Sequence, residues 1–99
     1  MKLFHGTSQE NHEQIIAEGR LLGPVFLTPS KQSAKEYAGR EGAVIEVDVD
    51  EDTLGVDFDL PGARILSVEE ANSYTGNEWT IQEYIDNGNS VASLQDVKI

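Results

Sequence analysis

Residues 43–49, Ala-Val-Ile-Glu-Val-Asp-Val, carry the clearest structural signal in the chain. The odd-numbered residues of this segment are all apolar, whereas Glu46 and Asp48 fall on even-numbered positions together with Val44. Side chains alternate between the two faces of a β-strand, so a period of two places the apolar set on one face. We therefore expect a strand here, with its apolar face buried and its acidic face exposed.

The residues before this strand predict two further strands and two helices. In chain order, these elements are a strand over 2–5, a helix ending at Gly19, a strand over 25–28 and a helix ending at Gly39. In the first strand, Leu3 and His5 share one face. Asn11 and Gln14 suit a capping box for the first helix, and Ser30 can cap the second.

The residues after this strand predict mostly β-structure. The expected elements are short strands over 54–58 and 64–67, a helical turn over 68–72, and strands over 79–85 and 91–99. Asn87-Gly88-Asn89 forms a turn between the last two strands. Two early helices followed by mostly strands predict an α+β fold built on antiparallel sheet.

The composition is that of an acidic globular protein. A length of 99 residues fits a single domain over residues 1–99. The chain has no cysteine and no run long enough for a signal peptide or a membrane span, so we expect a cytoplasmic protein with no membrane partner. Its formal net charge of −11 repels phosphate backbones and favours a protein partner over nucleic acid. The oligomeric state stays open.

Two segments begin like metal sites but do not complete them. Residues 12–16, His-Glu-Gln-Ile-Ile, start like a zinc-protease helix, but Ile16 takes the position of the second histidine. Asp48, Asp50 and Asp52 have the opening spacing of a calcium loop, whose glycine and terminal glutamate are missing. We expect no bound metal.

Glu83 is the most unusual residue of the strand predicted over 79–85. In that register it shares a face with Trp79, Ile81 and Ile85. A carboxylate buried among apolar side chains is costly without a partner. Either Glu83 lines a cleft, or the strand buries its other face.

His5 and Tyr37 each allow two interpretations. His5 ends a strand and precedes Gly6, where a ligand can approach the backbone closely, but a histidine of this kind can also be a core residue satisfied by a carbonyl. Tyr37 has helical spacing to Ala34 and Ala38, which suits a core residue as well as a ligand platform.

Three segments, taken together and in order, resemble the motifs of the diphtheria-toxin-like and poly(ADP-ribose) polymerase-like ADP-ribosyltransferases. Residues 3–7, Leu-Phe-His-Gly-Thr, are similar to the first-strand His-Gly-Thr/Ser motif. Residues 26–31, Phe-Leu-Thr-Pro-Ser-Lys, lead to Tyr37 at the interval that separates the strand aromatic from the helix tyrosine in the second motif. Residues 82–85, Gln-Glu-Tyr-Ile, resemble the third motif, in which Tyr-Ile follows the catalytic glutamate.

This resemblance implies an ADP-ribosyltransferase-like fold, in which two small, mostly antiparallel sheets form an NAD cleft beside two short amino-terminal helices. It makes NAD the co-substrate and calls for no metal. The residues that it places at the NAD site are His5, Gly6, Thr7, Phe26, Thr28, Tyr37 and Glu83. It assigns catalysis to Glu83, His5 and Tyr37.

The resemblance also implies a role for each group. The Gly6 backbone would bind the nicotinamide carboxamide, and His5 would bind the adenosine-side ribose. Tyr37 would stack on the nicotinamide ring, with Phe26 on its other side or beside the nicotinamide ribose. Glu83 would bind the ribose 2′-hydroxyl and stabilise the positive charge that develops as the nicotinamide–ribose bond breaks.

Two positions depart from the family pattern. Phe26 stands where tyrosine is usual, and Ala34 stands where a serine often supports the nicotinamide amide, while Ser33 points elsewhere on an ideal helix. The function implied is mono-ADP-ribosyl transfer from NAD to a macromolecular acceptor, with protein favoured, in an effector of a phage or toxin system by analogy. An NAD glycohydrolase and a non-enzymatic acidic interaction or inhibitor protein are the alternatives.

Overall fold

The computed structural model describes residues 1–59, 61 and 64–99. The helices are α1 (Gln9–Glu18), α2 (Lys31–Ala38), α3 (Val68–Thr75) and α4 (Ile81–Asp86), with a single 3₁₀ turn, η1 (Glu51–Thr53). The strands are β1 (Lys2–Thr7), β2 (Arg20–Leu21), β3 (Val25–Leu27), β4 (Ala43–Asp48), β5 (Leu54–Asp57), β6 (Ile65–Ser67), β7 (Ser90–Ser93) and β8 (Val97–Lys98). Together these elements form the α+β fold that the sequence predicts.

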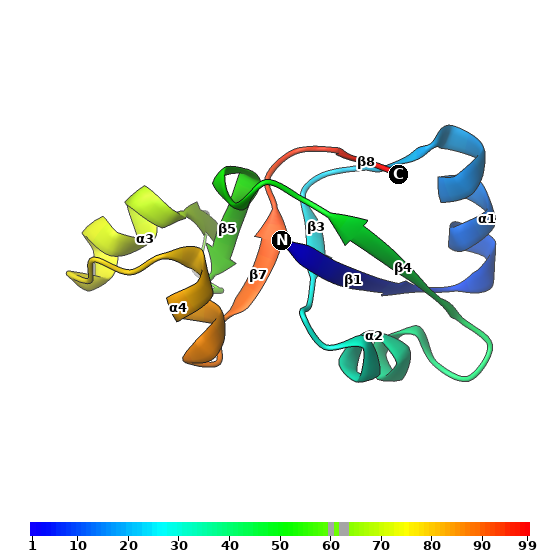
Figure 1. Ribbon diagram of the computed structural model, residues 1–99, viewed down its shortest axis with the longest axis horizontal. Coiled ribbons are helices and arrows are strands. Elements are labelled where there is room, and N and C mark those ends of the chain that lie inside the picture. Colours follow the sequence, from blue (N-terminus) through cyan, green and yellow to red (C-terminus); the bar gives the residue numbers. More distant parts are fainter. Residues whose placement is uncertain (60, 62–63) are drawn as a thin grey trace.

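The strands form three small sheets in which all pairs are antiparallel. They are β1–β4, β2–β8 and β3–β7–β5–β6. Phe4 and Thr28 exchange two backbone hydrogen bonds of 2.7 and 2.9 Å, which join β1 to the end of β3. Figure 1 shows the result: β1 and β4 lie with α1 and α2 on one side, and β5 and β7 lie with α3 and α4 on the other. The expectation of small antiparallel sheets is confirmed, but the described residues form three sheets rather than the two that the resemblance implies.

Strand β4 has the two faces that its sequence predicts. Ile45 and Val47 are buried in the core, as is Val49 directly after the strand, whereas Glu46 and Asp48 are exposed. Burial of each large aliphatic side chain contributes roughly 1.5–3 kcal/mol. The alternation therefore fixes which face of the β1–β4 pair packs inward.

The four-stranded sheet also has two different faces. Val56 and Val91 point into the core, while their neighbours Asp57 and Ser90 form a cross-strand pair on the opposite face. Helix α4 covers the core face, because the ring of Tyr84 lies edge-on to that of Phe58, 6.1 Å away between centroids. The Asp57 face remains open to form the floor of a cleft.

The two amino-terminal helices form where they are expected. Helix α1 ends at Gly19 and α2 ends at Gly39, both at positive φ, and the Ser30 side chain caps α2 by accepting the N–H of Ser33. The predicted cap of α1 is wrong, because Ser8, rather than Asn11, is its N-cap residue.

The strand predicted over residues 79–85 is also wrong, because this segment forms helix α4. Thr80 and Glu83 form a capping box, in which each side chain accepts the backbone N–H of the other residue. Ile81 and Tyr84, three positions apart, are buried on one side of the helix. These local hydrogen bonds and helical spacing outweigh the alternation that favours a strand.

The single strand predicted over 91–99 is divided into β7 and β8. The Ser93 hydroxyl donates to the carbonyl of Gln95 and accepts its N–H, which turns the chain between the two strands. Strand β8 then pairs with β2 rather than extending the four-stranded sheet.

Among the residues that the structure describes, no helix has the length and apolar character needed to cross a bilayer.

Candidate functional site

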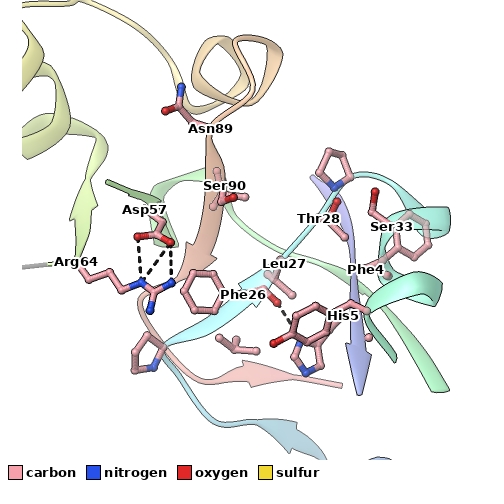
Figure 2. A pocket seen from close by; sticks show the side chains of 17 residues that line it. Phe4, His5, Phe26, Leu27, Thr28, Ser33, Asp57, Arg64, Asn89 and Ser90 are labelled. Carbon is pink, nitrogen blue, oxygen red and sulfur yellow. Dashed lines mark hydrogen bonds and ion pairs between the residues drawn. The ribbon is translucent and has the colours of Figure 1, made fainter. Parts of the chain in front are cut away.

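A cleft of about 630 Å³ lies along β1, β3, one side of α2 and the open face of the four-stranded sheet. Small-molecule pockets typically have volumes of about 300–1,000 Å³, so this cleft is large enough for a nucleotide-sized ligand. Its lining includes five of the residues predicted to contact NAD: His5, Gly6, Phe26, Thr28 and Tyr37. Figure 2 shows these elements around the cavity.

His5 is held on the cleft wall by a hydrogen bond to the next strand. Its Nδ1 lies 2.9 Å from the carbonyl oxygen of Phe26, as the dashed line in Figure 2 marks. A carbonyl oxygen only accepts hydrogen bonds, so Nδ1 carries the hydrogen and Nε2 of the neutral ring is an acceptor. The histidine can therefore accept a hydrogen bond from a ligand hydroxyl.

Gly6 presents its backbone to the cleft. In an antiparallel strand the N–H and C=O groups of alternate residues point to the same edge. Phe4 pairs with Thr28 on the edge away from β4, so the N–H and C=O of Gly6 face that same edge, on the side of β3. This leaves one donor and one acceptor beside the cavity that Gly6 lines.

The missing side chain of Gly6 serves helix packing rather than ligand approach, which corrects the sequence-based interpretation. A Cβ atom at Gly6 would overlap the carbonyl oxygen of Ala34 and lie 2.9 Å from its carbonyl carbon. Ala34 is itself buried, with 1% of its surface exposed. Two small residues thus let α2 pack directly on β1, which brings the first turns of α2 to the cleft.

Helix α2 and strand β3 supply aromatic walls. Tyr37 is 83% exposed and Phe26 is 41% exposed, although both line the cleft. Tyr37 is therefore not a core residue, and its role as a ligand platform stays a prediction. Ser33, expected to point elsewhere, also lines the cavity, and Thr28 lines it while accepting the N–H of Ser30.

An ion pair forms the far end of the cleft. Arg64 Nε and Nη2 donate to the two carboxylate oxygens of Asp57 over 3.2–3.3 Å, and the guanidinium carbon lies 5.1 Å from the centre of the Phe26 ring. Burial raises the pKa of the Asp57 carboxyl, but hydrogen bonds from Arg64 and from the Asp59 N–H outweigh burial, so its pKa lies below the ordinary value. The hydrogen bond from Arg64 to Asp57 raises the pKa of Arg64.

Two residues predicted for the NAD site lie outside the cleft. Thr7 is buried at the end of β1 and does not line the cavity. Glu83 is an exposed residue of α4, which packs on the face of the sheet opposite Asp57. Its Oε1 atom accepts the N–H and the hydroxyl of Thr80. Glu83 is thus a helix-capping residue here, and its catalytic role stays a prediction without support from the geometry.

Replacing Glu83 tests this placement. Glu83→Ala is expected to lower the free energy of unfolding by about 0.5–1 kcal/mol, because it removes half of the capping box. Glu83→Gln keeps the same hydrogen bond and should leave the stability nearly unchanged. Neither change should alter ligand affinity in the cleft, measured by calorimetric titration. A loss of affinity in Glu83→Gln at unchanged stability would place the residue at the site after all.

Acid should weaken the Asp57–Arg64 pair. Because the pKa of folded Asp57 is lower than that of the unfolded chain, the ionised carboxylate contributes stability that is present above about pH 4 and lost as the pH falls through the folded value. Urea unfolding of the wild type and of Asp57→Asn between about pH 6 and pH 2.5 measures this contribution. The difference between the two proteins should shrink below about pH 4. A constant difference would contradict the expectation.

Comparison with protein-family models, with curated proteins and with solved structures finds no match for this chain. A functional site is therefore inferred from the geometry of the cleft residues alone. Sequence reasoning missed Asp57, Arg64 and Ser90, because nothing local marks them. Asp57 and Ser90 meet through the register of β5 and β7, and Arg64 reaches Asp57 from the segment before β6.

Proposed function

We propose that the chain binds NAD in this cleft, in the manner of an ADP-ribosyltransferase domain. The observation that carries the proposal is the convergence of His5, Gly6, Phe26, Thr28 and Tyr37 on one cavity of about 630 Å³. These residues come from β1, β3, α2 and the segment between β3 and α2, and they belong to the first two sequence motifs.

The cleft offers complementary groups to each part of the nicotinamide riboside. A primary carboxamide has one acceptor and two donor hydrogens, which match the N–H and C=O of Gly6. Tyr37 presents an exposed ring on which the nicotinamide can stack. Nε2 of His5 can accept a hydrogen bond from a ribose hydroxyl, because Nδ1 is committed to Phe26. In this arrangement the hydroxyl belongs to the nicotinamide ribose, and not to the adenosine-side ribose that the resemblance implies.

The binding proposal is tested by titrating isotope-labelled protein with NAD and following the backbone amide signals. Amides of His5, Gly6, Phe26 and Tyr37 should shift together along one saturation curve. The amide of Glu83, on the far face of the sheet, should not move. Absence of any shift at millimolar NAD, or shifts centred on α4, would overturn the proposal.

Transfer of ADP-ribose to a protein acceptor is the second candidate function, and Asp57 is the observation that favours it. Cleaving the nicotinamide–ribose bond builds positive charge on the sugar, which a nearby carboxylate stabilises. Among the described residues that line the cleft, Asp57 is the one carboxylate, and its lowered pKa keeps it ionised at neutral pH. Both of its oxygens already accept hydrogen bonds from Arg64, which favours slow turnover.

Turnover is measured with NAD labelled on the adenosine side, in the presence of cell lysate. Asp57→Asn and Glu83→Gln form the matched pair of carboxylate-to-amide variants. Label on protein that disappears in Asp57→Asn alone supports transfer through Asp57, whereas loss in Glu83→Gln alone supports the role that the motif implies. Nicotinamide release without label indicates a glycohydrolase. Binding with no release leaves NAD binding as the function.

A further inference from the structure

We propose that Arg64 is the phosphate-binding residue of the cleft and makes the site selective for a ligand that carries a pyrophosphate. The inference depends on the proposed binding of NAD and adds a determinant that the sequence motifs do not contain. Arg64 is the one permanently charged cation among the described residues that line the cavity. The chain as a whole has seven basic residues against 18 acidic ones.

The guanidinium of Arg64 is fixed before any ligand arrives. Asp57 holds Nε and Nη2, and is itself fixed by the Asp59 N–H, which donates to Oδ1 over 2.8 Å. The side chain of Asp57 is only 10% exposed, whereas that of Arg64 is 57% exposed. Phe26 supports one face of the guanidinium from 5.1 Å. A planar cation held in this way loses little conformational entropy when it binds an anion.

Arg64 keeps hydrogen-bond donors for a ligand. A guanidinium has five N–H groups, of which Nε–H and one N–H of Nη2 go to Asp57. The two N–H groups of Nη1 and the second N–H of Nη2 donate to no acceptor among the residues that the structure describes. Their forked arrangement suits the oxygens of a phosphate group.

The order of the cleft residues matches the order of groups along a dinucleotide. His5 bonds the carbonyl of Phe26, as the dashed line in Figure 2 marks, and the guanidinium carbon of Arg64 lies over the ring of the same residue. If the nicotinamide lies over Gly6 and Tyr37 and its ribose lies beside Phe26, the next group along the ligand is the pyrophosphate. In this arrangement the pyrophosphate reaches Arg64, whereas a ligand that ends at the ribose is too short to contact it.

The charge around Arg64 determines how it acts. Asp57 neutralises the guanidinium, and the Asp59 carboxylate lies 3.6 Å from Nε, although Asp59 is 84% exposed to solvent. Arg64 therefore contributes directed hydrogen bonds rather than long-range attraction. Binding should consequently depend only weakly on salt, with a slope below that of a site built from unpaired lysines.

Arg64→Met tests the proposal, because it keeps an unbranched side chain against Phe26 and removes the charge and every donor. Arg40→Met is the matched control: it changes the net charge equally at an exposed residue outside the cleft. Calorimetric titrations use NAD, nicotinamide riboside (which lacks phosphates) and ADP. Arg64→Met should weaken NAD and ADP binding about tenfold or more. It should leave nicotinamide riboside binding unchanged, and Arg40→Met should change none of the three.

The outcomes separate this inference from the proposed function. Equal loss of NAD and nicotinamide riboside, or no loss of NAD, would overturn the role of Arg64 while NAD binding stands. Arg64-dependent binding of ADP in a protein that does not bind nicotinamide riboside or NAD would support the phosphate site and overturn the NAD proposal. A wild-type protein that binds none of the three ligands would overturn both.

Discussion

Replacing Gly6 with alanine is expected to lower the free energy of unfolding by about 3 kcal/mol or more, at the upper end of the cost of overpacking. The new Cβ atom would overlap the Ala34 carbonyl oxygen and lie 3.1 Å from the Ala38 nitrogen. Both are backbone atoms of α2, so no side chain can rotate away. The helix must move as a unit, and for a domain of this size the melting temperature should fall by at least about 12 °C.

Gly76→Ala is the matched control for this prediction. Gly76 caps α3 at φ 78°, and a Cβ atom there would meet no heavy atom within 4 Å. Its replacement should cost only about 1–2 kcal/mol, the strain of a left-handed residue. Thermal and urea unfolding of both variants give the comparison. Equal losses would show that α2 has room to shift and that Gly6 is not required for its packing on β1.

Replacing Tyr37 with alanine is expected to weaken NAD binding roughly 10- to 100-fold, because stacking of one aromatic ring on a base contributes about 1–3 kcal/mol. With 83% of its surface exposed, Tyr37 contributes little to the core, so the melting temperature should hardly change. This variant is therefore expected to lose NAD affinity while its melting temperature stays the same. Calorimetric titration with NAD and a thermal melt of the same sample measure both.

Two further variants show whether the ring itself is responsible. Tyr37→Phe keeps the ring and should bind NAD nearly as tightly as the wild type. Tyr74→Ala removes another exposed tyrosine, which lies on α3 outside the cleft. The centre of its ring is 5.7 Å from that of Phe58. This variant should leave affinity unchanged. A Tyr37→Phe variant as weak as Tyr37→Ala would show that the hydroxyl group, and not stacking, holds the ligand.

The parts of the fold that the sequence predicts are those set by neighbouring residues. The alternation over 43–49 defines β4, because each buried side chain is two positions from the next. Gly19 and Gly39 end their helices because each takes a positive φ, which a glycine adopts without steric cost. His5, Phe26 and Tyr37 each lie in a strand or helix that forms as expected, and all three line one cleft.

The error at residues 79–85 has a physical cause. Helix α4 has only six residues, so its helical period completes fewer than two turns and competes with an apparent period of two. The signals that decide the outcome are Thr80 and Glu83, spaced as a capping box, and the spacing of three between Ile81 and Tyr84. The same spacing accounts for Glu83 as a helix-capping residue.

The Asp57–Arg64 pair could not be read from the sequence. The two residues are seven positions apart and meet because β5 and β6 pair antiparallel, with Asp57 opposite Ile65. That register is set by the pairing of the two strands in the folded sheet, and no periodic pattern encodes it. Similarly, Ser90 faces the cleft only because β7 lies between β3 and β5.

The two-faced sheet under the cleft also bears on how this protein can be redesigned. Val56 and Val91 pack into the core from one face of the sheet, while the side chains of Asp57 and Ser90 lie on its other face. Libraries that randomise the cleft floor should therefore yield mostly folded variants, since the hydrophobic layer beneath stays intact. The same small scaffold can then be selected for small ligands of different shapes without first being stabilised.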